Sequence, residues 1–316
     1  MRRGDHVLVT GGAGFIGSHL VEALAVDHWV TVLDDFSKGT ELNLSPVKSR
    51  IRIVHASVLD REALQTAAMG ATAVFHLAAL TSVAESVKRP LDFSRVNVTG
   101  TNNVLEAAIA AGAERVVLAS SAAVYGDTGM EPAREDMAVK SLSPYATTKI
   151  AGEALCREYS RQFGLAAVAV RFFNVYGKRQ SADDPYASVI PRFTDALVFS
   201  GVPTVYGDGE QTRDFISVHD AVRHMIAAAT VDDRSVAGHV YNVGTGQRTS
   251  VNEVLRLLQE ASGSTVAANR LPAREGDIRH SVADVSRATA ELGVRAEVAL
   301  DAGLRDFVTW WREEQA

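Results

Sequence analysis

A tyrosine and a lysine four residues apart, Tyr145 and Lys149, are the first candidates for chemistry in this chain. If residues 145–163 form a helix, this spacing places both side chains on one face. An ammonium group beside a phenol favours the phenolate, and Lys149 together with the cation of a nearby cofactor would lower the phenol pKa from about 10 toward neutrality. Such a phenol can exchange protons at physiological pH, as general acid–base catalysis requires. The spacing alone also occurs by chance in helices, so its surroundings decide its meaning.

Two serines could assist this tyrosine. Ser120 and Ser121 follow an apolar run at 115–119, so their hydroxyls are expected at the carboxyl end of a strand. A serine there can hydrogen-bond a substrate oxygen while Tyr145 takes the proton; the alternative is an ordinary pair of turn serines. Ser143–Pro144 is a typical helix start and supports the helix that would carry Tyr145.

A glycine-rich turn predicts a phosphate site. An apolar run leads into Thr-Gly-Gly-Ala-Gly-Phe-Ile-Gly at 10–17, which opens an amphipathic segment. Gly11 and Gly12 are expected to take backbone angles closed to other residues. Gly14 has no Cβ to block a pyrophosphate, and Gly17 lets the helix lie close on the strand. The free N–H groups at the helix start then face the phosphates.

An acidic residue completes this pattern. Asp34 closes the next apolar run, 20 residues beyond Gly14, where dinucleotide-binding folds place the acid that binds the adenosine ribose. A carboxylate accepts hydrogen bonds from both ribose hydroxyls and repels a 2′-phosphate. The combination of strand, turn, helix and acid therefore predicts NAD, rather than NADP, as the cofactor.

Composition excludes several classes of protein. The 316 residues suffice for one large domain or two unequal ones, and 47% hydrophobic with 22% charged residues is typical of globular proteins. A net charge of −6 without long runs of one sign gives no support for nucleic-acid binding. No apolar stretch approaches the roughly 20 residues of a membrane span, and the first strand leaves no room for a signal peptide. We therefore expect a cytoplasmic protein without a membrane partner.

The single cysteine and the histidines indicate neither disulfide nor metal. Cys156 has no partner in the chain and falls in a helical stretch, where a small buried hydrophobe is expected. The nine histidines lack metal-ligand spacing. His76 ends a predicted strand near the chemistry, and a structural role is favoured over a catalytic one.

The elements that must position these residues alternate along the chain. Apolar, β-branched runs lie at 6–10, 29–34, 51–55, 73–77, 115–119 and 166–171, and helical patterns lie near 14–26, 60–69, 98–111 and 145–163. This alternation predicts an α/β fold, a Rossmann-type doubly wound parallel sheet with helices on both faces. Gly11, Asp34, His76, Ser120 and Ser121 then meet at the carboxyl ends of the strands, where such sheets bind ligands.

The pattern becomes irregular after about residue 171. We expect residues 1–170 to form the NAD-binding domain and residues 171–316 a smaller C-terminal substrate-binding domain. Helices are predicted near 189–200, 250–262 and 301–314, and a strand near 204–206. The pattern leaves open whether segments near 213–230 and 239–244 return to the sheet.

Seven segments together resemble the extended short-chain dehydrogenase/reductase family over essentially the whole chain. They are residues 10–17, 75–79, 97–101, 120–121, 124–126, 145–149 and 171–177. Within that family the chain is similar to nucleotide-sugar 4-epimerases, in which permanently held NAD oxidises the sugar at C4 and returns the hydride to the opposite face. The resemblance implies that Ser121 is the catalytic serine and Tyr145 the acid/base. Lys149 would bind the nicotinamide ribose and depress the tyrosine pKa.

The same resemblance implies a set of cofactor contacts. These are Gly11, Gly14, Phe15, Ile16, Asp34, Ser37, Gly39, Ser57, Val58, Leu77, Ala78, Ala79, Ser120, Tyr145, Lys149 and Phe173. Many relatives have an aspartate on the adenine amino group where this chain has Ser57. Serine can still hydrogen-bond there, so we expect weaker adenine contacts and no change of cofactor.

Substrate contacts are expected mainly from the C-terminal half. Arginine suits phosphate oxygens, and by resemblance Arg213 and Arg274 would bind the pyrophosphate of a UDP-sugar while Tyr206 lies beside the uracil. The full expected set is Thr81, Ser121, Asn174, Gln180, Ser188, Val189, Tyr206, Arg213, Arg274, Asp277 and Ser281. The resemblance also implies a homodimer joined through the helices near 98–111 and 145–163.

The sugar is less constrained. Ser281 stands where epimerases restricted to UDP-glucose and UDP-galactose tend to have a bulky tyrosine, so it leaves room for a 2-acetamido group. Segments 178–180 and 186–191 are similar to the subgroup acting on UDP-N-acetylglucosamine and UDP-N-acetylgalactosamine. Three positions depart from that subgroup: Thr81, Ala122 and Ser188 replace glycine, serine and alanine. Both sugar pairs, and UDP against dTDP, therefore stay open.

Two other functions compete with epimerisation. A sugar-nucleotide dehydratase or decarboxylase would be expected to carry acidic residues between Ser121 and Tyr125, because its chemistry needs extra acid/base groups. This chain has Ala122 and Ala123 there, unless another residue supplies the acid. A non-catalytic NAD-binding sensor would be free to lose the tyrosine or the lysine, and this chain keeps both.

Overall fold

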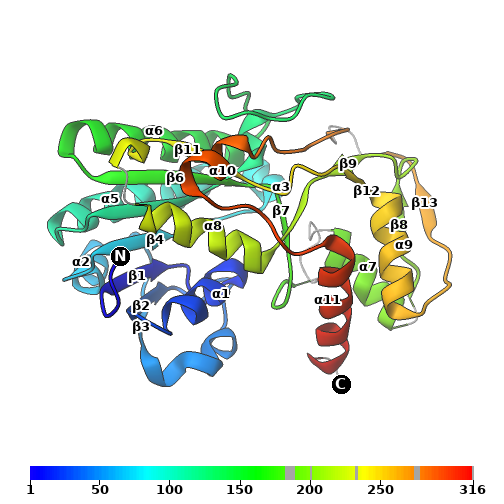
Figure 1. Cartoon of the computed structure of the whole chain (residues 1–316), viewed down its shortest axis with the longest axis horizontal. Coiled ribbons are helices and arrows are strands. Elements are labelled where there is room, and N and C mark those ends of the chain that lie inside the picture. Colours follow the sequence, from blue (N-terminus) through cyan, green and yellow to red (C-terminus); the bar gives the residue numbers. More distant parts are fainter. Residues whose placement is uncertain (182–188, 200, 232–233, 274–277, 315–316) are drawn as a thin grey trace.

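A seven-stranded parallel sheet forms the centre of the computed structural model, which describes residues 1–181, 189–199, 201–231, 234–273 and 278–314 (Figure 1). Its order is β11 (Val240–Val243), β6 (Ala166–Phe172), β5 (Arg115–Ser121), β4 (Ala73–His76), β1 (His6–Thr10), β2 (Trp29–Asp34) and β3 (Ile51–His55). The strand order reverses between β1 and β4, the point at which such sheets bind nucleotides. The predicted doubly wound fold is confirmed.

Helices cover both faces because successive strand residues point to opposite sides. Val7 and Val9 of β1 pack into one core with helices α1 (Phe15–Leu24), α8 (Val218–Thr230) and α10 (Ser286–Leu292), whereas Leu8 packs into the other. The second core contains α2 (Arg61–Ala68), α5 (Gly100–Ala110) and α6 (Pro144–Phe163). Strands buried on both faces explain the near-continuous apolar runs in the sequence.

The chain returns to the sheet after residue 213. Strand β11 pairs in parallel with β6, and α8 packs against α1 on the sheet. A short parallel pair of β7 (Asn174–Tyr176) and β10 (Phe215–Ser217) continues at the carboxyl end of β6. The segments that the sequence left open therefore lie with the sheet.

The C-terminal half builds a separate hydrophobic cluster, on the right in Figure 1. Helices α7 (Val189–Val198), α9 (Val251–Ser262) and α11 (Leu300–Glu314) pack together there. Phe193, Val254 and Phe307 are buried at their contacts. Two short sheets edge the cluster: β8 (Thr204–Tyr206) with β13 (Asn269–Leu271), and β9 (Thr212–Arg213) with β12 (Thr249–Ser250).

Short elements join these layers. They are η1 (Glu41–Arg50), α3 (Val83–Lys88), α4 (Pro90–Ser94), η2 (Arg95–Thr99), η3 (Ala122–Tyr125) and η4 (Arg234–Val236). The predicted helix near 98–111 is correct in type, but its start is the π-helical turn η2 that precedes α5. Ser143 caps α6 as expected, its Oγ accepting from Ala146 N at 3.1 Å.

Cys156 and His76 have the expected structural surroundings. Cys156 is buried in the second core, and burial raises its pKa to about 12. His76 lies between two threonines, with Nδ1 2.7 Å from Thr10 Oγ1 and Nε2 2.9 Å from Thr101 Oγ1. Burial lowers the His76 pKa to about 3, so the ring is neutral.

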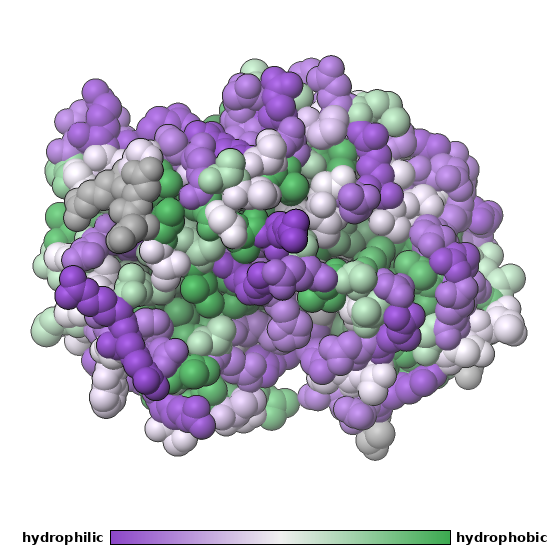
Figure 2. Space-filling model, in the orientation of Figure 1, coloured by the Kyte–Doolittle hydropathy of each residue, from purple (hydrophilic) through white to green (hydrophobic). Residues whose placement is uncertain are grey.

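No helix in the described part of the chain is long and apolar enough to cross a membrane. On the face shown in Figure 2, hydrophilic and hydrophobic residues are interspersed.

Candidate active site

A cavity of about 760 Å³ opens at the carboxyl ends of β1, β2, β4 and β5. Every residue expected to contact the cofactor lines it: Gly11, Gly14, Phe15, Ile16, Asp34, Ser37, Gly39, Ser57, Val58, Leu77, Ala78, Ala79, Ser120, Tyr145, Lys149 and Phe173. The fold therefore gathers into one space residues that are up to 162 positions apart in the sequence.

The glycine turn shows why side chains are excluded. Gly11 has φ +71°, and a Cβ there would lie 2.5 Å from Ala78 N. A Cβ on Gly17 would overlap Gly11 O, so only glycine lets α1 approach the turn this closely. A Cβ on Gly14 would meet only Gly11 O, at 3.4 Å, so this position faces open space. That is the cradle that a pyrophosphate needs.

The sequence led us to expect a glycine at position 12 because of its backbone angles, and this reason was wrong. Gly12 is not among the glycines with positive φ. A Cβ there would instead lie 2.9 Å from Val32 Cγ1 and 3.1 Å from Val21 Cγ2. The requirement for glycine at this position comes from close packing between β2 and α1.

Carboxylates close the adenosine end of the cavity. Asp34 Oδ2 accepts from Ala13 N at 2.9 Å and Oδ1 from Phe36 N at 2.8 Å. Burial raises the Asp34 pKa, and these backbone hydrogen bonds oppose the rise. Asp35 also lines the cavity and accepts from the Ser37 hydroxyl at 2.6 Å. Two carboxylates at the end of β2 suit ribose hydroxyls and disfavour a 2′-phosphate.

Three groups with proton-transfer chemistry meet in the same cavity. Ser121 lies close enough to the Tyr145 phenol to lower its pKa. Lys149 Nζ lies 5.7 Å from the centre of the Tyr145 ring and donates to Ala119 O at 2.9 Å. Helix α6 places the phenol and the ammonium on one face, and β5 brings the serine to them.

Burial dominates the titration of these groups. It raises the Tyr145 pKa, while the hydrogen bond from Ser121 lowers it. It lowers the Lys149 pKa to about 8, and the charge of Glu153 opposes this change. In the protein alone the Tyr145 pKa is therefore raised, because removing a phenolate from water costs more than this ammonium returns. The expected lowering of this pKa relied on a nicotinamide cation in addition to Lys149.

A buried ion pair lies behind the serines. Arg171 Nε and Nη2 donate to the two oxygens of Glu153 at 2.8 and 2.6 Å, and Ser120 Oγ donates to Glu153 Oε1 at 2.6 Å. The Arg171 guanidinium carbon also lies 4.6 Å from the centre of the Tyr125 ring. Glu153 was not predicted, although its four-residue spacing from Lys149 and the lone arginine in an apolar strand were visible signals.

The expected substrate residues separate into three groups. Thr81, Ser121 and Gln180 line the cavity. Asn174, Val189, Tyr206, Arg213 and Ser281 are described but are not among its lining residues. Ser188, Arg274 and Asp277 lie outside the described residues.

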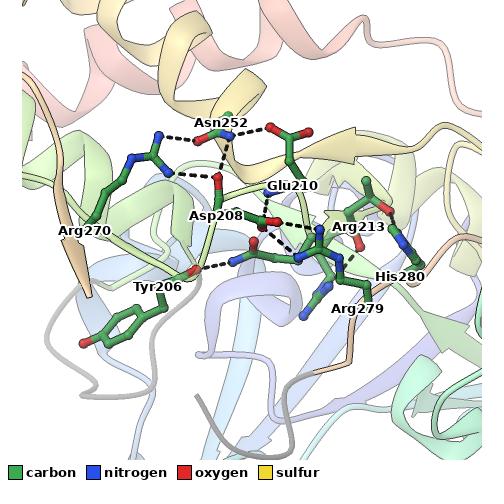
Figure 3. A network of polar contacts seen from close by, with 10 residues as sticks. Tyr206, Asp208, Glu210, Arg213, Asn252, Arg270, Arg279 and His280 are labelled. Carbon is green, nitrogen blue, oxygen red and sulfur yellow. Dashed lines mark hydrogen bonds and ion pairs between the residues drawn. The ribbon is translucent and has the colours of Figure 1, made fainter. Parts of the chain in front are cut away.

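Tyr206 and Arg213 flank a polar network in the C-terminal half (Figure 3). Arg279 binds Asp208 through two hydrogen bonds of 2.7 and 2.8 Å, and these lower the Asp208 pKa well below its usual range. Arg270 Nη1 donates to Asp208 O at 2.8 Å. Asp208 therefore joins β13 and the segment after it to the turn that follows Tyr206.

The cavity also contains charged residues that the sequence reasoning missed: Asp35, Lys38, Glu85 and Arg179. Arg179 Nη2 donates to Glu22 Oε1 at 2.5 Å, which links the loop after β7 to α1. Within the described ranges, no group of three or more His, Cys, Asp or Glu side chains could hold a metal ion.

The fold and this cavity define a dinucleotide-binding enzyme with a serine, a tyrosine and a lysine at the reacting end. The chain belongs to the NAD dependent epimerase/dehydratase family, which its residues 7–244 match. NAD is its cofactor, and the glycine turn and Asp34 fit it.

Relatives carry more than one activity. A UDP-glucose 4-epimerase of Mycolicibacterium smegmatis is 38% identical, over 97% of this chain and 98% of the relative. A UDP-N-acetyl-alpha-D-glucosaminuronate decarboxylase of Bacillus cytotoxicus is 36% identical, over 97% of each. The structure of a UDP-N-acetylglucosamine 4-epimerase from Methanobrevibacter ruminantium, in complex with UDP-N-acetylmuramic acid, has a TM-score of 0.94 and 35% identity, over 99% of this chain and 100% of the other.

Substituting alanine at two glycines should separate folding from cofactor binding. Gly17→Ala should lower the free energy of unfolding by about 1–3 kcal/mol, because its methyl group overlaps Gly11 O. Gly14→Ala should keep the thermal midpoint yet weaken NAD binding by roughly tenfold or more, because its methyl group occupies pyrophosphate space. Thermal unfolding and NAD titration test both, and equal effects of the two substitutions on both quantities would contradict this assignment.

Proposed function

We propose that the protein is a UDP-sugar 4-epimerase that inverts C4 through a transient 4-keto intermediate. The observation that carries the proposal is the meeting of Ser121, Tyr145 and Lys149 beside the glycine turn in one cavity. Residues 1–170, with the segments 213–230 and 239–244 that lie with the sheet, form the NAD-binding domain, and the rest of residues 171–316 carries most of the sugar-nucleotide contacts. The names of the two epimerase relatives support this choice.

NAD, held by the glycine turn, Asp34 and Lys149, would supply the hydride chemistry at C4 of the sugar. Tyr145, as phenolate, takes the proton of the C4 hydroxyl, and Ser121 hydrogen-bonds the same oxygen. Lys149 stabilises the phenolate and holds the nicotinamide ribose. After the ketone has turned over in the pocket, the Tyr145 phenol gives its proton back to the oxygen at C4, so the sugar gains and loses no atoms.

The residues between the serine and Tyr125 favour this cycle over the alternatives. Ala122 and Ala123 form the turn η3, and neither can move a proton. Dehydration or decarboxylation would then need an acid from elsewhere in the cleft. Because one relative is named as a decarboxylase, that activity is the second candidate, and a non-catalytic NAD-binding sensor is the third.

We infer that the protein is a homodimer joined through α5 and α6. Apolar side chains support an interface on this side of the molecule: Val87 and Leu91 are 65% and 83% exposed on α3 and α4, which pack against α6. Exposed apolar residues gathered on one side are typical of association surfaces.

The direct test is incubation of the purified protein, without added NAD, with UDP-glucose, UDP-N-acetylglucosamine and UDP-glucuronate. An epimerase converts at least one of them to a C4 isomer of the same mass, which chromatography separates. A product that has lost carbon dioxide or water identifies a decarboxylase or dehydratase. Unchanged sugars in the presence of bound NAD would support the sensor.

Tyr145→Phe should retain NAD and UDP-sugar binding and lose nearly all turnover, because the ring remains while the proton acceptor is gone. Binding by calorimetry and isomer formation under saturating substrate measure the two properties separately. A kcat close to that of the unchanged protein would remove Tyr145 from the proposed role.

Ser281→Tyr should reduce turnover of UDP-N-acetylglucosamine far more than that of UDP-glucose, because added bulk matters only where a 2-acetamido group needs room. The ratio of the two kcat/KM values is the measurement. Equal losses on both sugars would contradict the proposed place of Ser281 beside the sugar.

A further inference from the structure

A buried carboxylate lies one helical turn beyond Lys149. Glu153 follows the lysine by four residues on α6, so both side chains emerge on the same face. The Glu153 side chain is 4% exposed and does not line the cavity, so it touches neither cofactor nor sugar. We propose that Glu153 is a positioning residue that keeps Lys149 protonated beside Tyr145, a role that rests on the proposed function.

The contacts of Glu153 hold its charge in place. Both carboxylate oxygens accept from Arg171, and Oε1 also accepts from Ser120. A carboxylate with a two-point guanidinium partner and a hydroxyl donor remains ionised even when buried. Glu153 can therefore act on the lysine as a fixed anion.

The other groups around Lys149 do not supply a negative charge. On α6 itself the phenol of Tyr145 is neutral in its protonated form, and from β4 the neutral His76 faces the lysine. From β5 the ammonium meets only the carbonyl of Ala119. On β6 itself lies the cation Arg171, which disfavours a second positive charge nearby. Glu85 on α3 also lines the cavity, but among the described residues Glu153 is the carboxylate whose charge acts on the Lys149 pKa.

This anion matters because burial works against the ammonium. Burial lowers the Lys149 pKa to about 8, and Glu153 raises it. Without that charge the lysine would lose its proton within the physiological range and could no longer stabilise a phenolate at Tyr145. Ser120 lines the cofactor cavity and donates to the same carboxylate. Glu153 therefore acts on Lys149 and also holds Ser120 in place.

Nuclear magnetic resonance of the lysine side chains tests the proposal directly. The chain has six lysines, so 13C labelling at Cε gives few signals, and Lys149→Met identifies the one of interest. In NAD-saturated protein, Glu153→Gln should lower the titration midpoint of Lys149 by about one pH unit. Glu153→Asp should keep most of the original midpoint because it retains the charge. Glu158→Gln, which removes a carboxylate from the exposed side of the same helix, should leave it unchanged.

The double variant Glu153→Met/Arg171→Leu keeps the test decisive if Glu153→Gln does not fold, because it removes both buried charges together and leaves neither unpaired. The Lys149 midpoint should fall in this variant too, since Glu153 is the charge that raises the Lys149 pKa; a midpoint that stays or rises would overturn the proposal. An unchanged Lys149 midpoint in Glu153→Gln would also overturn the proposal. So would a loss of kcat in that variant that is the same at every pH. In Glu153→Gln we expect the alkaline limb of the kcat–pH profile to move to lower pH by the same amount as the Lys149 midpoint. A shifted midpoint in a protein that epimerises no sugar would instead refute only the proposed function.

Discussion

The ion pair between Glu153 and Arg171 holds together the elements that carry the reacting groups. It joins α6 to β6 with both partners almost entirely buried, and Ser120 at the end of β5 donates to the same carboxylate. Breaking a buried pair by removing one partner typically costs about 3–5 kcal/mol, because the remaining charge stays in a medium of low dielectric constant. The positions of Tyr145 and Lys149 relative to the sheet therefore depend on this contact.

The cofactor half of the site could be predicted because its residues lie at the ends of strands that the sequence pattern itself predicts. Apolar runs define β1, β2, β4 and β5, and in a parallel sheet their carboxyl ends must meet. Gly11 and Asp34 follow such runs directly, so their place was set by local pattern. The reason given for Gly12 failed, since close packing by Val32 is a tertiary contact that no local pattern reveals.

The substrate half of the site depends on contacts between residues distant in sequence, so fewer of its residues could be placed from the sequence. Tyr206 and Arg213 lie at the edge of a network that brings residues near 208, 252 and 279 together (Figure 3). Neither residue lines the described cavity, although both were expected at the nucleotide. Exposed ion pairs contribute little each, but the two-point bond of Arg279 to Asp208 fixes a direction as well as a distance.

The titration of the phenol explains why Lys149 alone does not make Tyr145 a base. Burial raises the Tyr145 pKa and lowers that of Lys149, so the protein by itself favours the neutral phenol. Forming the phenolate requires additional positive charge nearby, and an oxidised nicotinamide held in the cavity that Tyr145 and Lys149 line would supply it. A hydride acceptor and a competent proton acceptor then arise together. With a neutral ring in the same place, burial would again favour the protonated phenol, so the proton affinity of Tyr145 would follow the charge of the bound cofactor.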